Sequence, residues 1–230
     1  MKYSIIIPCF NESASLPLLM ERCKLITKNN DVEVIFVNNG STDNTNEILK
    51  DLIPKYPNCK SIYVKNNKGY GFGILSGLRV AKGNVIGWTH ADLQADPVDF
   101  LQGFKLFELY GNDIFVKGRR YGRPFIDKVF TFGMSIFESV LLLKPMWDIN
   151  AQPTLFNRNF FESWELPPED FSLDLYAYYS ALNQDIKIYR FPVKFGQREH
   201  GISHWNTSWS AKWRFIIKTI KYSIKLKKII

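Results

Sequence analysis

The chain has 230 residues and carries 30 Lys and Arg against 22 Asp and Glu, a formal net charge of +8. It is 46% apolar and 23% charged, which excludes a disordered, collagen-like or low-complexity chain. The length suits one large domain with a sizeable core. Three widely spaced cysteines form no disulfide framework or metal-ligand pattern, so we expect a reducing compartment.

The basic charge is concentrated at the C-terminus. From residue 201 to the end there are seven basic residues and no acidic ones, whereas the first 200 residues carry 23 basic and 22 acidic residues. A protein that coats nucleic acid would spread its positive charge more widely. We therefore expect no nucleic-acid partner.

The first half of the chain alternates short apolar runs with helical patterns. Such alternation predicts an α/β fold with a mostly parallel central sheet covered by helices on both faces. In such sheets, ligands bind beyond the carboxyl ends of the strands. The expected strands are Ser4–Ile7, Val32–Val37, Ile62–Val64 and Val85–Trp88, and the expected helices are Leu16–Ile26, Thr45–Ile53 and Phe72–Ala81.

The second half is less regular and shows no clear linker. We expect one catalytic domain over residues 1–205 and a basic C-terminal helix over residues 206–230. The expected elements of this half are helices at Pro97–Leu109, Phe125–Leu143 and Asp170–Leu182, and strands at Ile114–Val116 and Ile186–Phe191.

No segment is predicted to cross a membrane. A spanning helix needs about 20 mostly apolar residues. The nearest approach, Phe125–Leu143, is interrupted by Asp127, Lys128 and Glu138. The N-terminus lacks the charged and apolar regions of a signal peptide. We expect a cytoplasmic protein, with peripheral contact at the inner face of the membrane.

The segment His90–Pro97 carries the strongest chemical signal. It follows the strand Val85–Trp88, so its polar groups belong to the carboxyl edge of the sheet. Asp92 and Gln94 offer oxygen ligands that suit Mg²⁺ or Mn²⁺, and His90 adds a nitrogen that Mn²⁺ tolerates. A purely structural interpretation fits Asp96, which is placed to cap the helix that begins at Pro97, but it does not account for Asp92 and Gln94.

Three segments in order, Ile6–Glu12, Val37–Asp43 and Ala91–Gln94, resemble the inverting family-two glycosyltransferases of GT-A fold. The resemblance is strongest to dolichol-phosphate mannosyltransferases and their bacterial polyprenyl-phosphate relatives. It runs from about Tyr3 to about Trp205, which is nearly the whole chain. It implies a GT-A fold and a nucleotide-diphosphate sugar as donor, with UDP or GDP as the nucleotide.

The resemblance assigns residues to the donor site and the metal. In the metal motif, His90 replaces the first aspartate, while Asp92 and Gln94 keep the other two ligand positions for Mn²⁺ or Mg²⁺. Asn38 and Asn39 stand where acidic residues are usual, so the base preference of relatives does not transfer. The positions that match donor-nucleotide contacts are Pro8, Phe10, Glu12, Asn39, Ala91 and Asp92.

Further matches concern the diphosphate, the sugar and the acceptor. Arg119 would lie near the diphosphate, with a surface salt bridge as the alternative, and Arg120 fits a surface salt bridge. Gln152 is the expected contact to the donor sugar. Arg198, Ser203 and His204 match a segment that gathers on phosphate in relatives, where the planar guanidinium of arginine grips oxygens in pairs.

Asp170 has two interpretations that the sequence leaves open. With Asp174 it is expected on one helix face, where it would act as a general base for a sugar hydroxyl acceptor. Alternatively both are helix N-terminal acids that favour the helix dipole. A phosphate acceptor is already ionised and needs no base.

The tail carries tryptophans and isoleucines at three- and four-residue spacing, which predicts an amphipathic helix. With its lysines it is typical of a helix on an anionic membrane surface, although a helix docked on the domain fits too.

The sequence as a whole predicts a metal-dependent inverting glycosyltransferase with a polyprenyl phosphate acceptor. Two alternatives are transfer to a sugar hydroxyl of a cell-surface glycan such as lipopolysaccharide, and a degenerate module that binds a nucleotide sugar without turnover.

Overall fold

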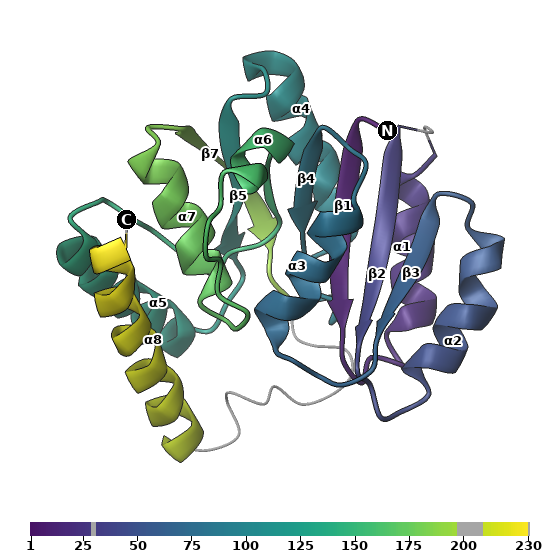
Figure 1. The fold of residues 1–230 in the computed structure, drawn as a ribbon, viewed down its shortest axis with the longest axis horizontal. Coiled ribbons are helices and arrows are strands. Elements are labelled where there is room, and N and C mark those ends of the chain that lie inside the picture. Colours follow the sequence, from purple (N-terminus) through teal and green to yellow (C-terminus); the bar gives the residue numbers. More distant parts are fainter. Residues whose placement is uncertain (29–30, 197–208, 230) are drawn as a thin grey trace.

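The computed structural model describes residues 1–28, 31–196 and 209–229, the last range without the side chains of residues 209–215 and 229. A seven-stranded sheet runs through the molecule in the order β3-β2-β1-β4-β6-β5-β7 (Figure 1). Only β6 runs against its neighbours, and the other six strands are parallel to one another. The strands are β1 (Tyr3–Cys9), β2 (Val32–Asn39), β3 (Cys59–Val64), β4 (Val85–Trp88), β5 (Ile114–Tyr121), β6 (Thr154–Asn157) and β7 (Lys187–Lys194).

Helices cover both faces of the sheet, as the sequence predicts (Figure 1). Side chains of successive strand residues point to opposite faces, so Ile5 and Ile7 of β1 pack in one core cluster and Ile6 in the other. The first cluster includes α1 (Leu16–Ile26), α2 (Thr45–Leu52) and α4 (Phe100–Tyr110). The second includes α3 (Tyr70–Val80), α6 (Arg158–Glu162) and α7 (Leu173–Asn183), with single residues of α5 (Phe125–Leu142) and α8 (Trp209–Ile229).

The predicted elements of the first half are confirmed with small shifts at their ends. The helix expected over Pro97–Leu109 is a 3-10 turn at Pro97–Asp99 followed by α4. Asp96 caps this turn through a hydrogen bond from the Val98 amide at 2.9 Å, as expected. The sequence does not predict β6 or α6, because elements of four and five residues show no periodicity.

The helix expected from Asp170 starts later. Asp170 precedes α7, and its carboxylate accepts a hydrogen bond from the Ser172 amide at 2.9 Å. This bond holds the backbone in a turn, so the helix begins at Leu173. The prediction that Asp170 and Asp174 share a helix face is therefore wrong. Asp174 is buried, while Asp170 is partly exposed.

The basic C-terminal helix is confirmed as α8, which packs against α5 (Figure 1). Its buried side chains within the described part are Ser223 and Leu226, whereas Ile217 and Ile224 are exposed beside lysines. These two isoleucines are therefore not packed on the domain, and the expected separation of an apolar stripe from a lysine face stays a prediction. The expected boundary at residues 205 and 206 lies outside the described residues. Across the described ranges, the structure contains no helix with the length and hydropathy needed to cross a bilayer.

Candidate functional site

The candidate site forms at the carboxyl edge of the parallel strands, where the loops after β1, β2, β4 and β5 meet. The reversed direction of β6 adds to this edge. Its first residue, Thr154, pairs with Trp88, the last residue of β4, and with Lys117 in the middle of β5. Gln152 therefore arrives at the same edge as the other predicted site residues.

The loops after β1 and β2 are held together by side chains. The carbonyl oxygen of the Asn11 side chain accepts a hydrogen bond from the Thr42 amide at 2.8 Å, and Asn11 has a left-handed backbone with φ of 57°. The Glu12 amide donates to the Thr45 hydroxyl at 2.9 Å. The Glu12 carboxylate accepts from the Ser15 hydroxyl at 3.1 Å. Glu12 is thus fixed beside the β2 loop.

The two asparagines at the end of β2 are buried and bonded within the protein. Asn39 donates through Nδ2 to the Gly69 carbonyl at 2.8 Å, and Asn38 accepts from the Ser41 amide at 3.1 Å. A Cβ on Gly73 would lie 3.3 Å from both Pro8 Cβ and Asn39 Nδ2, so these residues adjoin the first turn of α3. Phe10 is half-buried in the same region. The base contact expected of Asn39 stays a prediction.

The loop after β4 is sharply bent rather than extended. Leu93 has a φ of 58°, and the Asp92 carboxylate accepts a hydrogen bond from the Gln94 amide at 3.1 Å. Asp92 is only 3% exposed, as is Ala91 before it. The turn fixes the carboxylate of Asp92 close to the backbone of Gln94.

Gln94 also connects this loop to the end of β7. Its Nε2 donates to the Gly196 carbonyl at 3.2 Å, and the Gly196 amide donates to the Gln94 carbonyl at 2.8 Å. Gly196 stands two residues before Arg198 in the sequence. The predicted phosphate contacts Arg198, Ser203 and His204 themselves lie outside the described residues.

The donor set of this loop fits a divalent cation that arrives with a diphosphate. The candidate ligands are Asp92, the carbonyl oxygen of the Gln94 side chain and His90, whose ring centroid lies 5.4 Å from that of Tyr70. Within the described ranges, no cluster of three or more His, Cys, Asp and Glu could hold a metal by itself. Mg²⁺ and Mn²⁺ commonly take one or two carboxylates and complete their coordination with substrate phosphates and water.

A buried polar network lies beneath the site. The Lys117 ammonium is fully buried, donates to the Thr154 hydroxyl at 2.9 Å and lies 3.9 Å from the Asp174 carboxylate. The Trp88 indole donates to Asp174 at 3.3 Å. Burial lowers the pKa of Lys117 to about 7, against the opposing attraction of Asp174. Burial raises the pKa of Asp174, and Lys117 counteracts this shift.

Gln152 joins the network from the β6 side. Its Nε2 contacts the Tyr70 hydroxyl and the Asp174 carboxylate, the latter at 3.4 Å. Its Oε1 is buried and has no hydrogen-bond partner among the described residues. A Cβ on Gly118 would lie 2.2 Å from the Gln152 carbonyl oxygen, so only glycine at 118 lets the two backbones approach this closely.

The two arginines at the end of β5 have different surroundings. Arg119 is exposed at the site edge. Arg120 forms an ion pair with Asp148, which agrees with the salt bridge expected from the sequence. The pair is largely buried, however, and does not lie at the surface. Burial opposes ionisation of Asp148, yet the bonds from Arg120 outweigh it and lower the pKa of Asp148. The structure thus separates Arg119, which faces solvent, from Arg120, which is structural.

Asp170 lies in a loop that packs against the start of α3. The Phe72 amide donates to the Glu169 carbonyl at 2.8 Å, and the Phe171 ring stacks on Tyr70 with centroids 4.7 Å apart. The Asp170 carboxylate pairs with Lys218 of α8 at 2.8 Å. Although partial burial opposes it, the hydrogen bonds from Lys218 and Ser172 lower the pKa of Asp170. The loop therefore links α8 to the site.

The sequence analysis assigned no role to Tyr70 or to the pairing of Lys117 with Asp174. A signal for the pair was present, because a lysine directly after the apolar run Ile114–Val116 is expected to need a buried partner. The partner lies 57 residues further along the chain, and only the folded structure identifies it.

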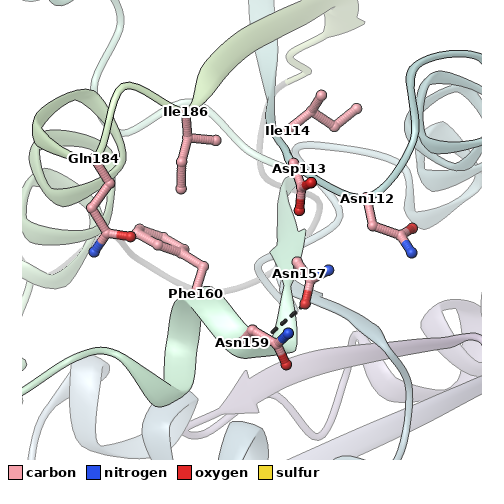
Figure 2. Close-up of a pocket in the computed structure, with 8 residues that line it drawn as sticks. All are labelled: Asn112, Asp113, Ile114, Asn157, Asn159, Phe160, Gln184 and Ile186. Atoms are coloured by element: carbon pink, nitrogen blue, oxygen red, sulfur yellow. Dashed lines mark hydrogen bonds between the residues drawn. The ribbon is translucent and has the colours of Figure 1, made fainter.

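A separate hollow of about 270 Å³ lies at the opposite edge of the sheet (Figure 2). It adjoins Ile114 and Asn157, which stand at the amino end of β5 and the carboxyl end of the antiparallel β6. It is therefore distinct from the candidate site.

Curated relatives support the family suggested by the site. One is the undecaprenyl-phosphate 4-deoxy-4-formamido-L-arabinose transferase of Photorhabdus laumondii, 36% identical over 171 residues, which cover 70% of this chain and 51% of the relative. The enzyme of the same name from Yersinia enterocolitica is 40% identical over 102 residues, 42% of this chain and 30% of the relative. The chain thus spans about a third to a half of the length of these relatives.

Solved structures share the fold. Glucosyl-3-phosphoglycerate synthase from Mycobacterium tuberculosis, in complex with Mn²⁺, UDP-glucose and phosphoglyceric acid, superposes with a TM-score of 0.76 at 16% identity, over 100% of this chain and 80% of that one. The mannosyltransferase PcManGT from Pyrobaculum calidifontis, in complex with GDP-mannose and Mn²⁺, gives a TM-score of 0.69 at 17% identity, over 97% of this chain and 64% of that one. At these identities the likeness establishes the fold alone.

The family itself follows from the sequence match that runs from β1 to the segment after α5. The model of glycosyl transferase family 2 matches residues 4–148, well over half of the chain, and includes the loops after β1, β2, β4 and β5 that form the site. The chain therefore belongs to glycosyl transferase family 2.

Proposed function

We propose that the protein is an inverting glycosyltransferase that moves a sugar from a nucleotide-diphosphate sugar to a polyprenyl phosphate. The observation that carries the proposal is the convergence of the Asp92–Gln94 turn, the joined loops after β1 and β2, and Arg119 at one edge of the sheet. The solved neighbours named above bind UDP-glucose or GDP-mannose with Mn²⁺, and the curated relatives are named for undecaprenyl phosphate.

The donor would lie across the strand ends. Pro8, Phe10, Glu12, Asn39 and Ala91 would surround the nucleoside. Asp92, Gln94 and His90 would hold Mn²⁺ or Mg²⁺, which when bound neutralises charge on the diphosphate. Arg119 would add positive charge beside the leaving group, where it stabilises the charge that develops in the transition state.

The acceptor oxygen would attack the anomeric carbon from the face opposite the diphosphate. A new carbon–oxygen bond forms as the bond to the nucleoside diphosphate breaks, which inverts the configuration. Gln152 would contact the sugar, because the Asp174 network holds its side chain at the strand ends. Arg198, Ser203 and His204 would bind the phosphate of the acceptor, which arrives ionised and needs no base.

A polyprenyl phosphate resides in a membrane, so we place the protein at the cytoplasmic face, in peripheral contact with anionic lipid. Lysines exposed on α8 support this placement, because basic residues near a membrane surface are attracted to anionic headgroups. These lysines are Lys218, Lys221, Lys225, Lys227 and Lys228.

The first test is thermal stability with UDP, GDP, CDP and dTDP, each with and without Mn²⁺. A ligand that binds only the folded state at a hundredfold excess over Kd stabilises it by about 2.7 kcal/mol, which raises Tm by several degrees. We expect one nucleotide to do so only with Mn²⁺, and Asp92→Asn to remove the metal dependence. The matched control is Asp113→Asn, because Asp113 is exposed and lies at the opposite edge of the sheet from the candidate site. No shift with any nucleotide would reject donor binding.

The second candidate is transfer to a sugar hydroxyl, as in the synthesis of lipopolysaccharide or another surface glycan, with Asp170 as the base. The Asp170 carboxylate lies in the loop that packs on the start of α3, which is the observation that favours this candidate. Its pair with Lys218 lowers the pKa of Asp170, which makes it a weaker base than an ordinary aspartate. Asp170→Asn distinguishes the two acceptors. A large loss of turnover with intact donor binding identifies a hydroxyl acceptor, and little effect identifies a phosphate. Lys218→Gln breaks the same ion pair but keeps the carboxylate, so it controls for the loss of the α8 contact.

Donor binding without product formation over polyprenyl phosphates and glycans would instead identify a degenerate binding module. The replacement of an acidic metal ligand by His90 is the feature that favours this third candidate.

A further inference from the structure

Helix α5 buries polar residues and exposes apolar ones, which is the reverse of an ordinary surface helix. Its three buried residues are Ser135, Glu138 and Leu142, two of which are polar. Its large apolar side chains are exposed, with Phe125 and Ile126 each at 78% and Val140 at 69%. The exposed apolar residues of α5 are Phe125, Ile126, Val129, Phe130, Phe132, Ile136, Phe137 and Val140.

These eight residues lie on one face of the helix, which we call the α5 apolar face. At about 100° per residue they fall within an arc of roughly 160°, along a helix about 27 Å long. The charged residues of α5, Asp127, Lys128 and Glu138, all lie outside this arc. Exposed apolar surface that is this continuous marks an interaction site.

The opposite face attaches α5 to the domain. The Asp148 amide donates to the Ser135 hydroxyl at 3.1 Å, and the Ser223 hydroxyl of α8 donates to an oxygen of the Glu138 carboxyl group at 2.8 Å. The helix is therefore fixed through its polar side, and its apolar face points away from the core. At the edge of that face, Phe132 packs edge-on against the half-exposed Trp147, with centroids 5.6 Å apart.

The charge around α5 determines which partner fits. Residues 119–144 carry five basic and two acidic residues, and one of those acids is the buried Glu138. The adjacent α8 adds exposed lysines at 218, 221, 225, 227 and 228. Two copies joined through this face would bring like charges together, whereas an anionic bilayer complements them.

We propose that the α5 apolar face inserts into the headgroup region of an anionic bilayer, as the apolar face of an interfacial helix does. Phe125 begins this helix six residues after Arg119, so the contact would place the membrane next to the site edge. The inference rests on the proposed function, in which the acceptor is a membrane lipid. It identifies the second contact surface of the protein besides the lysines of α8.

The test is sedimentation of the purified protein with vesicles of phosphatidylcholine alone or mixed with phosphatidylglycerol. The test variant is Ile126→Gln, Val129→Gln and Val140→Gln together, all exposed and on the α5 apolar face. The matched control is Leu109→Gln, Leu166→Gln and Val80→Gln, which are also exposed apolar residues and lie outside α5. We expect binding to the anionic vesicles to fall roughly tenfold or more in the test variant and to stay unchanged in the control.

A second measurement reports insertion directly. A nitrobenzoxadiazole dye on Val129→Cys should shift its emission to the blue with anionic vesicles, and the same dye on Leu109→Cys should not. Equal vesicle binding by both triple variants, or no blue shift at position 129, would overturn the proposal. So would a dimer in sedimentation velocity that the test variant dissociates, because the face would then bind a second copy.

The rise in Tm with nucleotide, measured without lipid, tests the proposed function independently of vesicle binding. If nucleotide binds and the α5 apolar face does not bind vesicles, the inference fails and the transferase proposal stands.

Discussion

At the scale of single residues, the site depends on a charge that is buried rather than exposed. Lys117 lies wholly inside the protein, and its ammonium faces Thr154 and Asp174. Asp174 in turn accepts from Gln152, the predicted sugar contact. A buried ion pair with additional hydrogen bonds contributes little net stability, but removing one partner leaves the other charge uncompensated. The network therefore keeps Gln152 in one orientation.

Lys117→Met tests this network. The substitution leaves Asp174 buried without its cation, so we expect a loss of about 3 to 5 kcal/mol in the free energy of unfolding at pH 6. Adding Asp174→Asn removes the uncompensated charge and should recover part of the loss. Urea unfolding of the wild type, the two single variants and the double variant measures the coupling. Strictly additive losses would show that Lys117 and Asp174 act independently.

At the scale of elements, α5 and α8 meet at the carboxyl group of Glu138, which burial keeps protonated up to a higher pH than usual. Burial raises the pKa of Glu138 from 4.5 to about 7, against a smaller opposing effect of the Ser223 hydrogen bond. The folded protein thus holds this proton more tightly than the unfolded chain. The stability that follows is fully present below pH 4.5 and is lost as the pH rises through 7.

Glu138→Gln replaces this carboxyl with an amide that is neutral at every pH. We expect the variant to match the wild type near pH 4.5 and to exceed its free energy of unfolding by about 2 to 3 kcal/mol at pH 8. Urea unfolding across this pH range measures the difference. Ser223→Ala keeps the carboxyl and should retain the pH dependence, which separates the charge from the hydrogen bond. A difference that does not change with pH would contradict the assignment.

At the scale of the whole molecule, the sequence correctly predicts the layered sheet and the positions of its first four strands along the chain. Their runs of buried β-branched residues alternate with helices, and connection rules then require parallel pairing. It predicts less of the second half, because β6 has four residues and reverses direction within the sheet. No local sequence pattern predicts that β6 runs antiparallel to its neighbours. This direction nevertheless brings Gln152, just before β6, to the carboxyl edge of the sheet.

The candidate site, too, is only partly predictable from the sequence. The acidic turn after β4 is visible in the sequence, since its residues are neighbours in the chain. The partners of those residues are not, because Gln94 bonds to Gly196, 102 residues away, and Lys117 pairs with Asp174 across the sheet. Sequence patterns identify which residue types a loop offers, and tertiary contacts decide which of their atoms are already engaged.

The double hydrogen bond between Gln94 and Gly196 bears on the sequence of events in a catalytic cycle. The side chain that would ligate the metal is the same one that holds Gly196, and the chain continues from there toward Arg198. A ligand that repositions the Gln94 amide would therefore also reposition Gly196, from which the chain continues to the segment that we propose binds the acceptor. Substrate addition would then be ordered, with the nucleotide sugar entering first and the nucleoside diphosphate departing last.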